Sequence, residues 1–475
     1  MADSQKQPVI VLLTSHWITM AGVALVTLAG FSWLFALPQN IRGHVGNPYM
    51  GLLVFMAIPA VFFAGLALIP IGIALGRRKA AAGLDGQPDR KTAWRRASIF
   101  FVVMTLANLV IGSQLTYRAV EHMETVQFCG QSCHVMQPEF TAHLLAPHHA
   151  VACVDCHVAP GASGWLQSKI NGTRQLKDVV FNTYARPIES AMESNRLPPA
   201  AETCEQCHSR EKFIGPRLYI HSEFKDDETN TRTETVLTMH VGGGSLGGIH
   251  GAHLGPGVRI RYAAADKTRQ TIPWVAYSNS TTGTTRTYLA SGTKPDTVSS
   301  LPTFEMQCVD CHNRASHSFE SPEHAVDRAL ATGQISSSLP FVKKAAIGLL
   351  KTAYTSQDDA AQKIPAALIS FYGKERSNDA QLAGQTLVAI YGSNVFPDLK
   401  VTWGTYPNNL GHMDAPGCFR CHDDSHSTSD NKAAAGKKTI TQDCSTCHEM
   451  LATEETSPAI LKTLGLNEAS GGVKQ

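Results

Sequence analysis

The sequence lacks a strong net charge, and long parts of its first quarter lack charged residues altogether. Its 475 residues carry a formal charge of +2 at pH 7, which is too small to attract nucleic acid through a general basic field. We therefore expect no nucleic-acid partner. Residues 7–41, 43–76 and 97–117 contain no Asp, Glu, Lys or Arg. Each stretch is long enough for an α-helix that crosses a bilayer, which needs roughly 20 residues.

These uncharged stretches predict three transmembrane helices in contact with membrane lipid, with apolar cores at residues 9–37, 51–76 and 98–117. Two alternatives are buried helices of a soluble protein and, for the first stretch, a cleaved signal peptide. Three apolar stretches separated by polar turns disfavour buried helices. The first apolar region is too long for a signal peptide, and its basic flank is thin.

The loop between the second and third stretches holds most of the basic charge near the predicted membrane. Residues 77–96 contain seven basic and two acidic residues, whereas the loop after the first stretch contains only Arg42. Basic loops stay in the cytoplasm. This rule places the amino terminus inside and the chain after Arg118 outside, on the periplasmic side of a bacterial inner membrane.

No cysteine is left without a close neighbour. The twelve cysteines form six pairs, and a histidine follows each pair directly. Five pairs have the spacing C-x-x-C-H: Cys153, Cys156 and His157; Cys204, Cys207 and His208; Cys308, Cys311 and His312; Cys418, Cys421 and His422; Cys444, Cys447 and His448. The first pair has one more residue between its cysteines, in Cys129, Cys133 and His134.

The C-x-x-C-H motif attaches c-type haem through two thioether bonds and supplies the proximal iron ligand. Zinc sites share the C-x-x-C spacing but do not need a histidine directly after it, so six such histidines favour haem. We predict six covalently bound haem c groups. In bacteria this attachment takes place outside the cytoplasmic membrane, in agreement with the loop charges. No lysine replaces a motif histidine, which disfavours a terminal reductase of the nitrite reductase type.

An electron-transfer haem normally takes a second axial ligand, either His or Met. Fourteen histidines lie outside the motifs, and five haems with two histidines each need only five of them. The candidates for the second ligand are His148, His250, His253, His317, His412 and His426. Of these, His412 and His426 are the strongest candidates from their positions on either side of the fifth motif, and His250 is the next.

The predicted fold is a multihaem cytochrome c with an N-terminal three-helix transmembrane bundle, followed by a loop-rich, mainly α haem domain with a small β insertion. Alternating segments predict strands, and Ser321-Pro322 predicts a helix start that Gly333 ends. The predicted divisions are residues 1–118 for the anchor, 119–225 for haems one to three, 226–305 for the β-rich insertion, 306–405 for haem four and a helical region, and 406–475 for haems five and six.

The segment from Phe128 to Glu139, which contains Cys133-His134-Val135-Met136, resembles the NapC/NirT/NrfH family of membrane-anchored quinol dehydrogenases. The resemblance covers roughly residues 98–215, and the motifs at Cys418 and Cys444 look like those of longer relatives with three N-terminal helices. It implies Met136 as axial ligand of the first haem in place of His134. It also implies a quinol pocket beside that haem with one basic and one acidic residue. Lys169 and Asp178 are the candidates for that pocket.

The leading hypothesis is a hexahaem cytochrome that oxidises membrane quinol, such as menaquinol, and relays electrons to a periplasmic cytochrome or reductase, or to extracellular respiration. The alternative is an electron-transfer subunit of a larger respiratory membrane complex without a quinol site of its own. A third hypothesis, a periplasmic reductase with an open haem position, is disfavoured. Reduction of the isolated protein by quinol separates the first hypothesis from the second.

The number of haems is directly testable. We expect six covalent haems, including one at the irregular site of Cys129 and Cys133, because every cysteine belongs to a pair followed by histidine. The measurement is the intact mass of the denatured protein together with a haemochrome count. A mass that corresponds to five haems would remove the irregular site.

Overall fold

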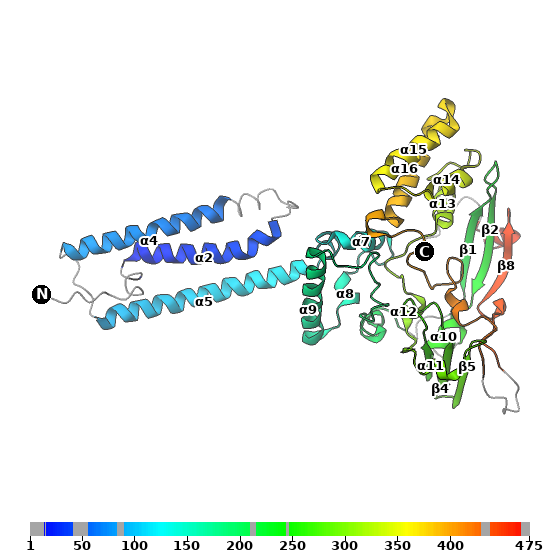
Figure 1. Cartoon of the computed structure of the whole chain (residues 1–475), viewed down its shortest axis with the longest axis horizontal. Coiled ribbons are helices and arrows are strands. Elements are labelled where there is room, and N and C mark those ends of the chain that lie inside the picture. Colours follow the sequence, from blue (N-terminus) through cyan, green and yellow to red (C-terminus); the bar gives the residue numbers. More distant parts are fainter. Residues whose placement is uncertain are drawn as a thin grey trace. The chain divides into compact units, whose positions relative to one another are not determined.

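The computed structural model describes residues 14, 16–40, 56–82, 90–209, 215–243, 247–428 and 438–466. The chain divides into two compact units, Met1–Thr125 and Val126–Gln475. Figure 1 shows the first unit in blue to cyan and the second in teal to red. The division falls close to the predicted end of the anchor at residue 118. The finer divisions within the second unit stay predictions.

The first unit consists of three long helices, α2 (Trp17–Asn40), α4 (Ile58–Ala81) and α5 (Arg90–Met123). Helices α2 and α4 approach closely at glycines, because a Cβ atom on Gly22 would lie 2.8 Å from the backbone oxygen of Gly65. Small residues at such contacts are typical of helix pairs in membranes. Apolar side chains on the other faces are exposed, as in Phe63 and Leu109.

Two helices in the described part of the chain, Ile58–Lys79 and Lys91–Met123, are long and apolar enough to cross a membrane. The described apolar segment of α2, Trp17–Trp33, is shorter. Residues 9–13, at the start of the first predicted span, and residues 51–55, at the start of the second, lie outside the described residues. The structure therefore supports a membrane protein with apolar N-terminal helices, and the three-span bundle stays a prediction.

The second unit combines short helices with two antiparallel sheets. Its helices are α6 (Val126–Gln131), α7 (Gln137–Leu145), α8 (Cys153–His157), α9 (Gly161–Val180), α10 (Gly248–Leu254), α11 (Pro295–Val298), α12 (Cys308–Cys311), α13 (Pro322–Ala331), α14 (Val342–Leu350), α15 (Gln357–Tyr372), α16 (Ser377–Asn394) and α17 (Ala459–Thr463). Its strands are β1 (Arg217–Phe224), β2 (Arg232–Met239), β3 (Val258–Ala263), β4 (Trp274–Asn279), β5 (Thr284–Leu289), β6 (Thr303–Glu305), β7 (Ser427–Thr428) and β8 (His448–Glu455).

The two sheets have the strand orders β1-β2-β8 and β6-β3-β4-β5-β7. They cross the boundaries predicted at residues 225 and 305, because β1 precedes the first boundary and β7 and β8 come from the C-terminal segment. Strand β8 pairs with β2, with Met239 opposite His448. The sheets therefore bring the last haem motif beside the middle of the chain.

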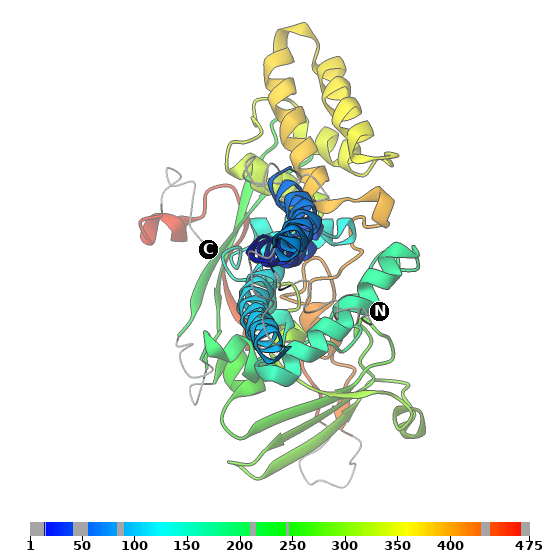
Figure 2. The same cartoon turned by 90° about the vertical axis from the view of Figure 1, so that its left-hand side faces the viewer.

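The largest apolar core lies among α13, α14, α15 and α16 and is independent of the cysteine motifs. Val326, Leu339, Leu350 and Leu387 in this core are fully buried. The Ser321 side chain accepts a hydrogen bond from the backbone N–H of His324 and so caps α13, as the sequence predicts. Figures 1 and 2 show the α15–α16 hairpin and the five-stranded sheet at opposite ends of the second unit.

Candidate haem-binding sites

The five regular motifs each form a single helical turn. Helices α8 and α12 contain two of them, and 3-10 turns at Cys204–Gln206, Gly417–Arg420 and Cys444–Thr446 contain the others. In the fourth motif the backbone N–H of His312 donates to the carbonyl of Cys308 at 2.8 Å. Residues three apart in a helical turn lie on the same side. Both thiols of a pair can therefore reach one porphyrin, with the histidine directly after them.

The first motif has a different backbone. Helix α6 contains Cys129 but ends at Gln131, and Cys133 is extended, with φ −114° and ψ 108°. A new 3-10 turn then begins at His134 and ends at Met136. The extra residue thus moves His134 from the end of one turn to the beginning of the next, and Met136 comes within the same new turn.

The His134 side chain contacts the hydroxyl group of Tyr184. Its Nε2 lies 3.2 Å from the hydroxyl oxygen of Tyr184. The Tyr184 hydroxyl in turn accepts a hydrogen bond from Nη2 of Arg186 at 2.5 Å, and the guanidinium of Arg186 lies 4.0 Å from the centre of the tyrosine ring. Met136 is 36 % exposed. The nitrogen of His134 that would bind iron therefore already has a partner.

None of the twelve cysteines, all of which lie in the described part of the chain, forms a disulfide, and neighbouring motifs along the chain are neighbours in space. Thiols of the first and second motifs, Cys129 and Cys153, interact directly, as do thiols of the third and fourth, Cys204 and Cys308. Electrostatic interactions between thiols link the remaining consecutive motifs: Cys156 with Cys204, Cys311 with Cys418, and Cys418 with Cys447. The six motifs thus follow one another in unbroken order.

Each of the other five motif histidines faces a histidine from elsewhere in the second unit. The distances between ring centres are 6.1 Å for His157 and His317, 6.0 Å for His208 and His148, 6.2 Å for His312 and His250, 5.8 Å for His422 and His253, and 6.3 Å for His448 and His412. Two imidazoles on opposite sides of one metal, with bonds of roughly 2 Å, have ring centres about 6 Å apart. The five pairs have the spacing of axial ligands.

Two further histidine pairs contain no motif histidine. His143 lies 6.0 Å from His317, with its Nδ1 2.6 Å from the hydroxyl oxygen of Ser316. His221 lies 5.3 Å from His324. Proximity between two histidines therefore does not identify a ligand by itself. The five pairs above are distinguished because each contains the histidine that directly follows a cysteine pair.

Hydrogen bonds orient several of the paired rings. The Nδ1 atoms of His148, His253, His317 and His422 lie 3.1, 2.7, 2.9 and 2.9 Å from the backbone oxygens of Ala315, Ile249, Glu139 and Thr441. An Nδ1–H that donates to a carbonyl fixes the tautomer and leaves Nε2 as the atom that binds a metal. The rings are thus held in the form and orientation that iron ligation requires.

Burial also keeps these imidazoles neutral. It lowers the pKa of His253 and of His312, and it lowers the pKa of His317 to about 4. Because a histidine is charged only below its pKa, these rings are neutral at pH 7. The neutral ring is the form that binds metal.

These features fit haem c: paired cysteines on one side of a turn, and neutral imidazoles at the spacing of two axial ligands. Zinc would instead need four ligands gathered around one point. Within the described ranges, no group of three or more His, Cys, Asp or Glu residues is arranged to hold a metal ion. The donor set therefore agrees with haem and disfavours zinc.

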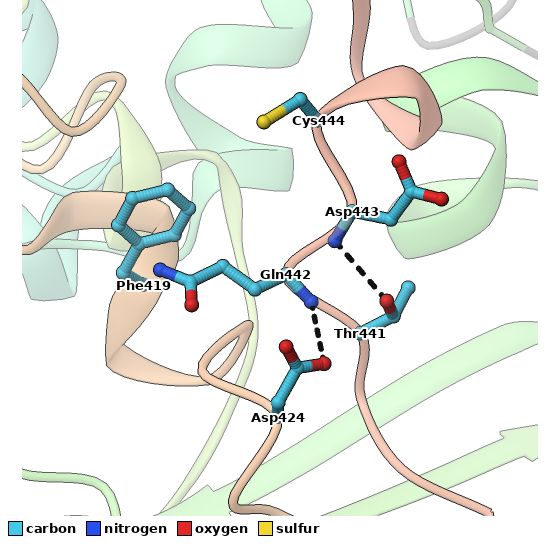
Figure 3. Close-up of a pocket in the computed structure, with 6 residues that line it drawn as sticks. All are labelled: Phe419, Asp424, Thr441, Gln442, Asp443 and Cys444. Atoms are coloured by element: carbon cyan, nitrogen blue, oxygen red, sulfur yellow. Dashed lines mark hydrogen bonds between the residues drawn. The ribbon is translucent and has the colours of Figure 1, made fainter.

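An open pocket of about 520 Å³ lies beside the sixth motif, lined by Phe419, Asp424, Thr441, Gln442, Asp443 and Cys444 (Figure 3). Asp424 accepts a hydrogen bond from the backbone N–H of Gln442 at 3.0 Å. The ring of Phe419 stacks on His412, with 4.4 Å between their centres. The Cys444 thiol and the Phe419 ring, which stacks on the paired histidine His412, thus line one pocket. This lining is expected where the edge of a porphyrin lies.

The structure corrects the prediction for His426. This residue is 1 % exposed, and both of its ring nitrogens have partners. Nδ1 lies 2.8 Å from Oδ1 of Asp423, and Nε2 lies 2.7 Å from the backbone oxygen of Ile272. No nitrogen is left for iron, so His426 holds the loop after the fifth motif against the five-stranded sheet.

The structure also corrects the predicted pocket of Lys169 and Asp178. Both residues lie in α9, and their separation of nine positions corresponds to about 2.5 helical turns. Their side chains therefore point to opposite sides. Lys169 places its ammonium 5.3 Å from the centre of the Trp165 ring, whereas Asp178 accepts a hydrogen bond from the Thr183 hydroxyl at 3.1 Å. One quinol cannot contact both residues.

Sequence reasoning missed a buried ion pair beside the second site. Oε1 of Glu139 lies 3.7 Å from Nη1 of Arg314, and Oε2 of Glu139 lies 3.2 Å from Nδ1 of His317. Burial raises the pKa of Glu139, and the nearby Arg314 opposes this rise. The ring of His317 is fixed by the backbone oxygen of Glu139, and the ion pair lies directly beside it. A charged residue on the buried face of α7, directly after Met136-Gln137-Pro138, was the available signal.

A second buried network anchors the fourth motif. Asp310, inside the motif, accepts hydrogen bonds from the hydroxyl of Tyr262 and from the backbone N–H of Gln307. Nη1 of Arg269 lies 3.3 Å from the same carboxylate. A buried charge is stable only when it is paired in this way. The x positions of C-x-x-C-H can hold many residue types, so the motif does not reveal this role of Asp310.

Comparison with known proteins found similar sequences along most of the chain. Residues 91–240 match the model of the NapC/NirT cytochrome c family, N-terminal region. The cytochrome c-type protein ImcH of Geobacter sulfurreducens is 36 % identical over 454 residues, which cover 91 % of this chain and 87 % of ImcH. The cytochrome c nitrite reductase subunit NrfH of Nitratidesulfovibrio vulgaris is 32 % identical over 111 residues, 22 % of this chain and 62 % of NrfH. No solved structure matches the chain.

The histidine pairs generate a test on adjacent residues. We expect His148→Ala to make one haem high-spin without loss of its covalent attachment, because His148 faces His208 and its removal opens one axial position. The matched control is His149→Ala, since Nδ1 of His149 lies 3.1 Å from the Ala146 backbone oxygen and the ring faces no motif histidine. The measurement is the electron paramagnetic resonance spectrum of the oxidised protein. A fully low-spin His148→Ala protein would contradict the pairing.

Proposed function

The chain belongs to the NapC/NirT cytochrome c family, and we propose that it oxidises membrane quinol at its first haem and relays the electrons through five further haems. One observation carries the proposal. Five motif histidines face a second histidine at 5.8 to 6.3 Å, whereas His134 faces Tyr184. Five sites are thus suited to electron transfer alone, and the first is suited to contact with a substrate.

The backbone of the first motif supports ligation by Met136. His134 is bound to the Tyr184 hydroxyl and begins a new turn after the extended Cys133. Met136 ends the same turn, and its thioether is flexible and soft enough to bind iron. The alternative is that His134 binds the iron and Met136 only packs against the porphyrin edge. The hydrogen bond between the Tyr184 hydroxyl and Nε2 of His134 argues against this alternative.

Residues next to the first motif can hold a quinol. Quinol oxidation releases two electrons and two protons, and haem iron supplies a one-electron acceptor. Tyr184 and Arg186 present a hydroxyl and a guanidinium beside His134 and can hydrogen-bond a quinol oxygen. These two residues replace Lys169 and Asp178 as our candidates for the polar side of the pocket. The type of quinol, such as menaquinol, is not specified by these groups.

The order of the motifs supports a relay. Consecutive motifs are in contact or in electrostatic range from the first to the sixth, so each transfer step is short. The thioether bonds and paired histidines fix each site in place, and their burial tunes its potential. The C-terminal pair of motifs would then deliver electrons to a periplasmic cytochrome or reductase, or toward extracellular respiration.

A role as one subunit of a larger respiratory complex is the second candidate. The relative NrfH is named as a subunit of cytochrome c nitrite reductase, and it matches the region of the first motifs. In such a role the helices would dock to other subunits, and the isolated protein would not accept electrons from quinol. Quinol reduction of the purified chain therefore separates the two candidates.

We place the protein in a bacterial inner membrane with three transmembrane helices and its haem unit on the periplasmic side. The basic loop at residues 77–96 and the site of haem attachment support this topology. Protease added to sealed vesicles of opposite orientation is expected to cut the basic loop from the cytoplasmic face and the haem unit from the other. Cleavage of both from one face would overturn the topology.

Stopped-flow mixing of quinol with the purified protein tests where electrons enter. We expect Met136→Leu to shift the spectrum of one haem and to slow reduction by quinol about tenfold or more, equivalent to ~1.4 kcal/mol or more in the barrier. Leucine keeps the volume but has no sulfur for iron. Met450→Leu, on strand β8, is the control and should reduce at the wild-type rate. Reduction of Met136→Leu at the wild-type rate with an unaltered spectrum would contradict the proposal, and wild-type protein inert to quinol would favour the subunit role.

A further inference from the structure

Helix α9 (Gly161–Val180) exposes its apolar side. Trp165, Leu166, Ile170, Leu176 and Val180 are 40, 56, 42, 54 and 67 % exposed. At 3.6 residues per turn these five side chains project within an arc of roughly 140°. Helix α9, which is labelled in Figure 1, has no buried residue. These five side chains form an apolar face of α9 that the rest of the unit does not cover.

The opposite side of α9 is polar and partly covered. Ser168, Asn171 and Asp178 are half-buried there. Asp178 is further tied to Thr183 by a hydrogen bond of 3.1 Å. A surface helix of a soluble protein buries its apolar stripe and exposes its polar one. Helix α9 has the reverse arrangement, which requires an apolar environment outside the protein.

Basic residues lie within and beside this apolar face. Lys169 and Lys177 are within its arc, and Arg174 is at its edge, while the single acidic residue of the helix, Asp178, is on the other side. The ammonium of Lys169 lies 5.3 Å from the centre of the Trp165 ring, so its stem follows apolar surface. Long basic side chains can extend in this way from an apolar layer to the headgroups above it.

We propose that α9 lies in the plane of the membrane surface, with its apolar face among lipid acyl chains and its lysines at anionic headgroups. Interfacial helices have this combination of apolar and basic residues. Lysine is depleted in the centres of protein interfaces, so Lys169 and Lys177 favour lipid over a second protein. The chain also reaches Gly161 soon after Met123, the end of a candidate membrane span.

The inference goes beyond quinol oxidation and does not depend on it. It gives the haem unit a second attachment to the membrane, through a helix that follows the second motif directly. An attachment on both sides of the first two motifs would hold the first site at the lipid surface. Immersion of α9 and reduction by quinol are separate measurements, so either can fail without the other.

Spin labels on single introduced cysteines test the immersion in the full-length protein. Native cysteines are consumed by haem attachment, so Leu166→Cys and Val180→Cys each provide one free thiol on the apolar face. Gln167→Cys and Gln175→Cys are matched controls on the exposed part of the opposite side. The labelled proteins are placed in nanodiscs of phosphatidylglycerol and phosphatidylcholine. Power saturation then compares collisions with oxygen, which is concentrated in lipid, and with a water-soluble nickel chelate.

We expect oxygen to relax the labels at positions 166 and 180 more strongly than the nickel chelate does, and the reverse at positions 167 and 175. Lys169→Glu combined with Lys177→Glu should move the label at position 166 toward the aqueous pattern, because anionic headgroups no longer attract the helix. Two results would overturn the proposal. The apolar-face labels could give the aqueous pattern, or they could be shielded from both reagents, as they would be under a second copy, a partner protein or a porphyrin.

Discussion

Under the proposed haem ligation, the second unit depends on one constraint: the histidine of each regular cysteine pair must meet an imidazole from a distant part of the chain. A motif of five residues can attach a porphyrin, but it occupies only one side of the iron. The second side is closed by tertiary structure. His157 meets His317, and His312 meets His250, across segments that have no local contact in sequence. The sheets and loops of the unit bring these paired histidines together.

This constraint explains why hydrogen bonds hold several of the paired rings. A ring that must present Nε2 to iron has to be held at Nδ1, and backbone carbonyls do this for His148 and His253. The backbone oxygen of Glu139 holds Nδ1 of His317 in the same way, and Arg314 lies beside the buried Glu139 carboxylate. The apolar core of α13 to α16 lies apart from the motifs and stabilises the unit without taking part in ligation.

The parts of the protein that depend on local sequence could be predicted. The cysteine pairs, the cap at Ser321 and the apolar helices follow from spacing and composition. The partners of the motif histidines could be narrowed to a few candidates but not paired, because the pairing depends on which segments the fold brings together. The candidate His426 was wrong because nothing in the sequence reveals that the Ile272 carbonyl closes its Nε2.

The two-residue quinol pocket was wrong for a different reason. Lys169 and Asp178 were chosen by type, whereas helical periodicity already places residues nine apart on opposite sides. The extent of the sheets could not be predicted either. Strand β8 pairs with β2 only because the fold brings the C-terminal segment beside the middle of the chain. Tyr184 and Arg186 could not be predicted as pocket residues, because they follow α9 and belong to no recognisable sequence motif.

The central claim is that five sites have two histidine ligands and the first has sulfur. Near-infrared magnetic circular dichroism of the oxidised protein tests it most directly, because low-spin haems with two nitrogen ligands and those with a sulfur ligand give separate charge-transfer bands. We predict intensities in the ratio of five nitrogen-ligated haems to one sulfur-ligated haem, with the sulfur band absent in Met136→Leu. Six nitrogen-ligated haems, or a sulfur band that survives the substitution, would contradict the account.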